Sequence, residues 1–112
     1  MSLRVHIDHT RGPAVIALTG DLDNESSILA HVAASVAIHR AAVSIVDMTG
    51  VTFIDASGVT ALLLWRHLAD TDGLRLVPSA SVTRLLDLCG LSAGFDIRRS
   101  VNGAIDPQDH AA

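Results

Sequence analysis

The chain has 112 residues, of which 49% are hydrophobic and 18% are charged, and these proportions favour a single folded domain over a disordered chain. Its formal net charge of −4 argues against a nucleic-acid partner, because surfaces that bind nucleic acid concentrate Lys and Arg. All eight basic residues are Arg, and the lack of lysine excludes Schiff-base enzymes, phosphate loops with a lysine and the receiver domains of response regulators.

The cysteine content and the apolar runs indicate the compartment. Cys89 is the only cysteine, so no internal disulfide is possible, and no basic-then-apolar leader opens the chain. No apolar run approaches the roughly 20 residues that a membrane-spanning helix needs. We therefore expect a cytoplasmic protein that does not enter a membrane, with Cys89 as a small core residue.

The first part of the chain predicts a β-hairpin. Residues 3–9 alternate apolar and polar side chains, which is typical of an edge strand with one solvated face. Residues 11–13 form a tight turn with glycine and proline, and residues 14–20 are a nearly continuous apolar run that suits a strand buried on both faces. We expect the two strands to pair antiparallel.

A helix and a third strand follow. Clustered side-chain acceptors in residues 21–26 predict a helix start, with Asp23 or Asn24 as the cap and an end near Arg40. A third strand is predicted at residues 43–47. The predicted apolar stripe of the helix consists of large and small residues at helical spacing, Ile28, Val32, Ala33, Val36 and Ala37.

The second half predicts three more helices, the last of them weak, and two short strands. A helix at about residues 57–70 is apolar over most of its girth, so part of its surface is expected to meet a partner. A strand at 74–78 precedes a helix at 80–89, capped by Ser79, ended by Gly90 and with Val82, Leu85, Leu86 and Leu88 as its apolar side. A fifth strand is expected within 94–98, a weak helix at 100–107, and a disordered tail at about 106–112.

This order predicts a single α/β domain that spans residues 1–112, with its core at about 3–98. Its small mixed sheet begins with the hairpin and continues with parallel βαβ units. Because parallel strands end at the same edge of a sheet, we expect the turn with Asp21 and Asp23 to lie beside the turn with Asp55 and Ser57.

Ser57 allows several interpretations. It stands just before Gly58 at a strand-to-helix turn, where it could cap the helix, accept a phosphate, or do both. A catalytic serine is disfavoured because the Gly-x-Ser-x-Gly elbow is missing. Asp21, Asp23 and Asp55 could hold Mg²⁺ if their turns meet, but two caps and a solvated carboxylate are the better interpretation. The six histidines lack zinc-site spacing, so we expect no catalytic residue, metal or cofactor.

Three motifs carry a resemblance to a known family. They are GDLD at residues 20–23, VDMTGVTFIDASGV at 46–59 and RLLDLCGL at 84–91. In this order and spacing, the chain resembles the STAS domain of bacterial anti-sigma factor antagonists. It departs from the family pattern in Ala56, where serine is common, in Thr60, where glycine is common, and in the larger residues Leu64 and Trp65.

The resemblance implies a regulator that is not an enzyme. In that family the serine at the position of Ser57 is phosphorylated by an anti-sigma factor that is a serine kinase, and a serine phosphatase reverses this. The unphosphorylated form binds the anti-sigma factor and frees the sigma factor. The expected surface for partner binding and switching comprises Asp21, Asp23, Asp55, Ala56, Ser57, Gly58, Thr60, Leu64 and Trp65. We expect a monomer in the free form. The alternative is a STAS scaffold or sensor that binds a protein, nucleotide or lipid without phosphorylation.

Overall fold

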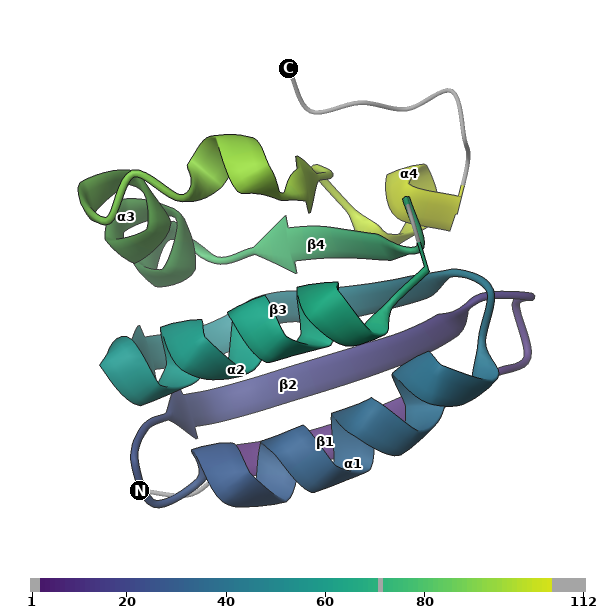
Figure 1. Ribbon diagram of the computed structural model, residues 1–112, viewed down its shortest axis with the longest axis horizontal. Coiled ribbons are helices and arrows are strands. Elements are labelled where there is room, and N and C mark those ends of the chain that lie inside the picture. Colours follow the sequence, from purple (N-terminus) through teal and green to yellow (C-terminus); the bar gives the residue numbers. More distant parts are fainter. Residues whose placement is uncertain (1–2, 71, 106–112) are drawn as a thin grey trace.

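The fold is a five-stranded mixed sheet with helices on both faces (Figure 1). The computed structural model describes residues 3–70 and 72–105. The strand order β1-β2-β3-β4-β5 follows the sequence. The elements are β1 (Leu3–Asp8), β2 (Ala14–Leu22), α1 (Ser27–Arg40), β3 (Ser44–Ile54), α2 (Ala56–Leu68), β4 (Leu74–Pro78), α3 (Ala80–Leu88), the 3₁₀ turn η1 (Ser92–Gly94), β5 (Asp96–Ile97) and α4 (Val101–Ile105).

The predicted hairpin and the parallel units are both confirmed. β1 pairs antiparallel with β2, with Leu3 opposite Gly20 and Asp8 opposite Val15. β2, β3, β4 and β5 then run parallel to one another. The α/β class and the mixed sheet follow the sequence expectation, and the last strand and the last helix lie within their predicted ranges. The tail predicted at 106–112 lies outside the described residues.

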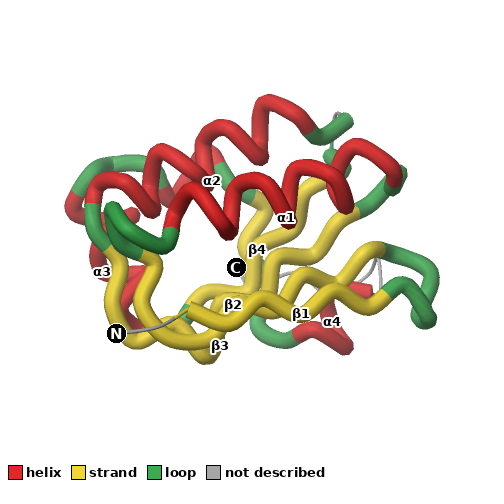
Figure 2. The backbone as a smooth tube through the Cα atoms, turned by 90° about the horizontal axis from the view of Figure 1, so that it is seen from below, coloured by secondary structure: helices red, strands yellow, loops and turns green. Residues whose placement is uncertain are grey.

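The two faces of the sheet are covered unequally. Figure 2 shows α1 and α2 together on one side of the sheet and α4 on the other. The larger core joins the sheet to α1, α2 and α3 and contains Leu18, Ile38, Met48, Leu62, Trp65 and Leu86. The smaller core consists of Val15, Ile45, Val77 and Ala104, so α4 closes the second face. Among the described residues, no helix is long and apolar enough to cross a membrane.

The third strand is longer than predicted. We expected it to end at Asp47, but it continues to Ile54 because its second half keeps pairing with β2 after a register irregularity. Gly50 lies at this irregular stretch, where a Cβ atom would come within 3.0 Å of the Thr19 Oγ1 atom. The residues after Asp47 are therefore a strand that carries Asp55 to the end of the sheet.

Helix α1 turns a different face to the core than we predicted. Its buried residues are Ala30, Ala34, Ala37 and Ile38, whereas Ile28, Val32 and Val36 are exposed. Both sets have helical spacing, but the small alanine side chains allow the helix to approach the sheet closely. The predicted stripe was wrong for Ile28, Val32 and Val36, whereas Ala37 is buried and Ala33 half-buried.

Helix α3 confirms its caps but not its whole apolar side. The Ser79 hydroxyl accepts a hydrogen bond from the Val82 N–H at 3.3 Å, and Gly90 follows the helix with a φ of +70°. Val82 and Leu86 are buried as predicted, but Leu88 is exposed. Cys89 is exposed too, so our prediction of a core residue was wrong. It follows the last helical residue, Leu88, and caps the exposed end of the helix.

Candidate functional site

The two turns that the sequence placed at one edge of the sheet do meet there. The backbone N–H of Asp55 donates a hydrogen bond to the Leu22 carbonyl at 3.3 Å, which ties the end of β3 to the end of β2. The Thr52 hydroxyl donates to the Asp21 carboxylate at 3.2 Å across the same strand pair. The Ser57 hydroxyl reaches the Asn24 side-chain oxygen at 3.3 Å. The site is therefore built from the β2–α1 turn and the first turn of α2.

Asp55, and not Ser57, caps helix α2. Its backbone is extended, and its Oδ1 atom accepts hydrogen bonds from the N–H groups of Ser57 at 2.9 Å and Gly58 at 3.3 Å. Asp55 precedes Ala56, the first helical residue, so Ser57 is the second residue of the helix. The cap interpretation of Ser57 was wrong, because Asp55 caps the helix two residues earlier, so Ser57 lies inside the helix and its own N–H is one of the two that the cap binds.

The hydroxyl of Ser57 lies at the surface and is not used to stabilise the helix. Ser57 is half-buried, and its hydrogen bond to Asn24 is a contact with another turn. The neighbouring hydroxyl of Thr60 differs, because it donates to the Ala56 carbonyl at 3.0 Å within the same helix. Of these two hydroxyls on the first turns of α2, that of Ser57 is the one directed to the adjoining turn.

Asp23 organises the other turn. Its Oδ1 atom accepts hydrogen bonds from the N–H groups of Ser26 at 3.0 Å and Glu25 at 3.1 Å, so it caps the turn before α1 and not the helix itself, which begins at Ser27. The Ser26 N–H, followed by the Ser26 hydroxyl and the Glu25 N–H, holds the pKa of Asp23 below its ordinary value of 3.8. The ionised carboxylate of Asp23 therefore stabilises the fold above pH 3.8, and this contribution is lost as the pH falls through the lowered pKa.

An apolar groove opens beside Ser57, between α1 and α2. It has a volume of about 310 Å³ and is lined by Ser27, Ile28, His31, Ser57, Thr60, Ala61 and Leu64. Ile28 and Leu64 are both exposed. Asn24 was not predicted as a neighbour of Ser57, nor Ile28 as a surface residue. The alanines of α1 also recur at helical spacing, and if they face the core, Ile28 is left at the surface.

Three of the residues predicted for the switch surface are buried. Asp21 is 5% exposed and Trp65 is 0% exposed, and Gly58 is buried where α2 crosses β2. Trp65 lies in the core because α2 packs on the sheet with that side. Asp23, Asp55, Ala56, Ser57, Thr60 and Leu64 keep some exposure and remain candidates for the surface.

The described residues offer no metal site. Nowhere in residues 3–70 and 72–105 do three His, Cys, Asp or Glu side chains come together in a group that could hold an ion. Asp21, Asp23 and Asp55, the set that we considered for Mg²⁺, instead bind Thr52, the turn amides and the amides of α2 respectively. Each carboxylate thus has a structural role.

Comparisons with known proteins agree with this architecture. Residues 5–98 match the family described as "Mlab, STAS domain". An anti-sigma factor antagonist from Mycobacterium paratuberculosis superposes with a TM-score of 0.85 at 19% identity, over 93% of this chain and 92% of that one. The anti-sigma factor antagonist SpoIIAA in its unphosphorylated form gives 0.69 at 26%, over 94% of each chain.

A second structure of the same relative adds a different state. The Bacillus cell fate determinant SpoIIAA in the phosphorylated form gives a TM-score of 0.64 at 25% identity, over 94% of this chain and 97% of that one. No match is found among curated proteins.

Proposed function

Since this chain belongs to the STAS domain family, we propose that it is an anti-sigma factor antagonist that acts by binding and is switched at Ser57. The unphosphorylated protein binds an anti-sigma factor with serine-kinase activity in the cytoplasm and so releases a sigma factor. Phosphorylation of Ser57 ends this binding, and a serine phosphatase restores it. The protein itself catalyses no reaction.

One observation carries the proposal, namely that Ser57 keeps a hydroxyl at the surface of the α2 start while Asp55 does the capping. A serine that caps a helix needs its hydroxyl for the backbone, whereas Ser57 can lose its hydroxyl proton without loss of the cap. SpoIIAA, which is 26% identical to this chain, has been solved in an unphosphorylated and a phosphorylated form, which supports a phosphorylation cycle here.

The modification is an ordinary phosphoryl transfer. The Ser57 Oγ atom forms a bond to the γ-phosphorus of ATP, the bond from that phosphorus to the β–γ bridging oxygen breaks, and ADP leaves while the hydroxyl proton passes to a base of the kinase. The partner kinase supplies ATP, Mg²⁺ and the base. This chain supplies the positioned hydroxyl.

The local charges explain how a phosphate would act as a switch. A phosphoserine adds about −1.5 to −2 charges at pH 7. The N–H groups of Ser57 and Gly58 already bind Asp55, so they are not free to neutralise the phosphate. The new charge would lie close to the carboxylate of Asp55, which binds the Ser57 N–H, and at the rim of the apolar groove. A partner that buries this groove would have to desolvate the charge, which opposes binding without any refolding.

The proposal is tested by mapping the phosphate. The protein is incubated with its cognate kinase and ATP and then analysed by mass spectrometry, and we expect a single phosphate on Ser57. The variant Ser57→Ala should take up none. The matched control Thr60→Ala, which removes the neighbouring hydroxyl of the same helix, should be phosphorylated like the wild type.

A phosphate on another residue, or continued phosphorylation of Ser57→Ala, would contradict the assignment of Ser57. No phosphorylation by any kinase that binds the protein would favour the alternative of a STAS scaffold without a phosphorylation cycle.

A further inference from the structure

The outward face of α1 carries four large apolar side chains that are each more than half exposed. Ile28, Leu29, Val32 and Val36 are 72%, 62%, 59% and 51% exposed. At 100° per residue, they fall within an arc of about 100° on the side of the helix opposite the buried alanines. A continuous exposed apolar stripe of this kind marks an interaction surface.

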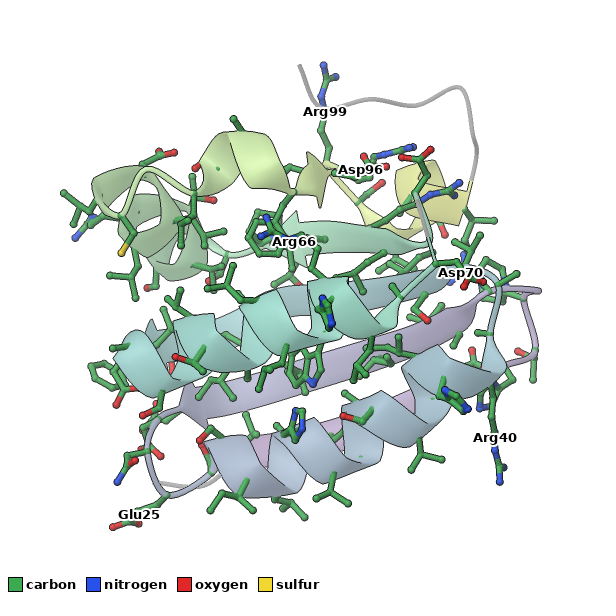
Figure 3. The ribbon with its side chains drawn as sticks, viewed as in Figure 1. Glu25, Arg40, Arg66, Asp70, Asp96 and Arg99 are labelled. Carbon is green, nitrogen blue, oxygen red and sulfur yellow. The ribbon has the colours of Figure 1, made fainter. Side chains whose placement is uncertain are left out.

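Charges bracket the stripe at its two ends. Figure 3 shows Glu25 just before the start of α1 and Arg40 at its end, both directed away from the rest of the molecule. Between them, the helix Ser27–Arg40 carries no acidic residue at all. The stripe is therefore apolar along its length, negative beyond one end and positive at the other.

This pattern is complementary to itself. Leu29 and Val36 lie at equal distances on either side of the bond between Val32 and Ala33, and Glu25 and Arg40 are equally spaced about the same bond. With a rise of 1.5 Å per residue, Arg40 is roughly 11 Å from this point along the helix, and Glu25 lies in the turn just before the first helical residue, Ser27. A two-fold axis through it would place Leu29 against Val36 of a second copy and Glu25 against Arg40 of that copy.

We propose that the outward face of α1 is a homodimer interface, in which two copies pack their α1 helices antiparallel about a two-fold axis near Val32. Leu29, Val32 and Val36 form the centre of the contact, Ile28 lies at its margin toward α2, and two Glu25–Arg40 ion pairs flank it. This inference does not depend on phosphorylation of Ser57.

The size of the face sets the expected strength. Stable interfaces bury about 800 Å² on each partner, and a single helix of this length offers less than that. The dimer is therefore weak, with a dissociation constant in the range of about 10 μM to 1 mM. The monomer that we expected from the sequence is the form in dilute solution.

The test is sedimentation velocity of the full chain between about 10 μM and 1 mM, which covers the range expected for a weak interface. The wild type should shift from monomer to dimer across this range. Val32→Asp should remain monomeric throughout, because it places two carboxylates near the axis. Leu88→Asp, which puts the same charge on an exposed leucine of α3, is the matched control and should dimerise like the wild type.

Charge exchange tests the antiparallel geometry. Glu25→Arg and Arg40→Glu should each weaken the dimer about tenfold, since each converts two attractive pairs into repulsive ones. The double variant Glu25→Arg/Arg40→Glu restores opposite charges and should return the dissociation constant to near the wild-type value. Circular dichroism confirms that each variant is folded.

Two results would overturn the inference. If the wild type stays monomeric at the highest concentration, the protein has no such interface. If Val32→Asp then also fails to bind the kinase, this face of α1 binds the anti-sigma factor instead. A dimer that is insensitive to Val32→Asp and to the charge exchange uses another surface, such as the edge of β1. Variants that cannot form the dimer should still be phosphorylated on Ser57. Failure of the dimer inference would therefore leave the proposed function untouched, and the reverse also holds.

Discussion

Replacing Ser57 with aspartate is expected to weaken binding of the unphosphorylated protein to its anti-sigma factor by about thirtyfold, which corresponds to about 2 kcal/mol. The substitution adds one carboxylate at the rim of the groove lined by Ile28 and Leu64. That charge cannot use the N–H groups of Ser57 and Gly58, which Asp55 already occupies. Isothermal titration calorimetry with the purified anti-sigma factor measures the change.

The matched control is Ser57→Asn, which has the shape of the aspartate without its charge. It should lose much less affinity than Ser57→Asp, because only the contact with Asn24 changes. If both variants bind alike, shape and not charge governs the contact. If Ser57→Asp binds as tightly as the wild type, Ser57 lies outside the interface and the electrostatic mechanism is wrong.

Replacing Gly58 with alanine is expected to destabilise the domain by about 2 kcal/mol, within the range measured for overpacked sites. A Cβ atom at this position would lie 2.7 Å from the Ile54 Cγ1 atom and 2.8 Å from the Leu22 carbonyl oxygen. The same carbonyl accepts the hydrogen bond from Asp55 that joins the two turns. Helix α2 would have to move away from β2 to make room, and urea unfolding measures the cost.

The sign of this effect is diagnostic. Alanine is favoured over glycine inside a helix by about 1 kcal/mol, so Gly58→Ala would stabilise the protein if α2 did not approach β2 so closely. The control Thr60→Ala changes an exposed residue two positions further along the helix and should shift the free energy of unfolding by less than about 0.5 kcal/mol. A Gly58→Ala protein as stable as the wild type would show that α2 does not approach β2 as closely as the structure places it.

The order of elements could be predicted because local signals agree with the fold. The alternation in β1, the continuous apolar run of β2 and the Ser79 cap of α3 each have one interpretation, and the parallel crossovers follow from that order. The meeting of the two turns followed from the same topology, since β2 and β3 run parallel as neighbours.

The faces of the helices could not be predicted in the same way. Helix α1 has two sets of apolar residues at helical spacing, one of alanines and one of larger side chains, and periodicity alone does not decide between them. The alanines are buried because the helix packs closely on the sheet. Trp65 and Leu64 are adjacent in a continuous apolar run of α2, so the sequence did not reveal that one is in the core and the other at the surface.

The role of Ser57 depends on Asp55, which lies two residues before it. A serine at a strand-to-helix turn predicts a cap, but the extended backbone of Asp55 lets its carboxylate cap the helix two residues earlier, so that Ser57 lies inside the helix. The cap by Asp55 is what leaves the Ser57 hydroxyl available.

The most direct test of the account compares the affinity of one anti-sigma factor for the protein before and after stoichiometric phosphorylation of Ser57. The account predicts that the phosphoserine form binds more than about a hundredfold more weakly, which corresponds to roughly 3 kcal/mol, and that phosphatase treatment restores the original affinity. Equal affinities of the two forms would contradict it.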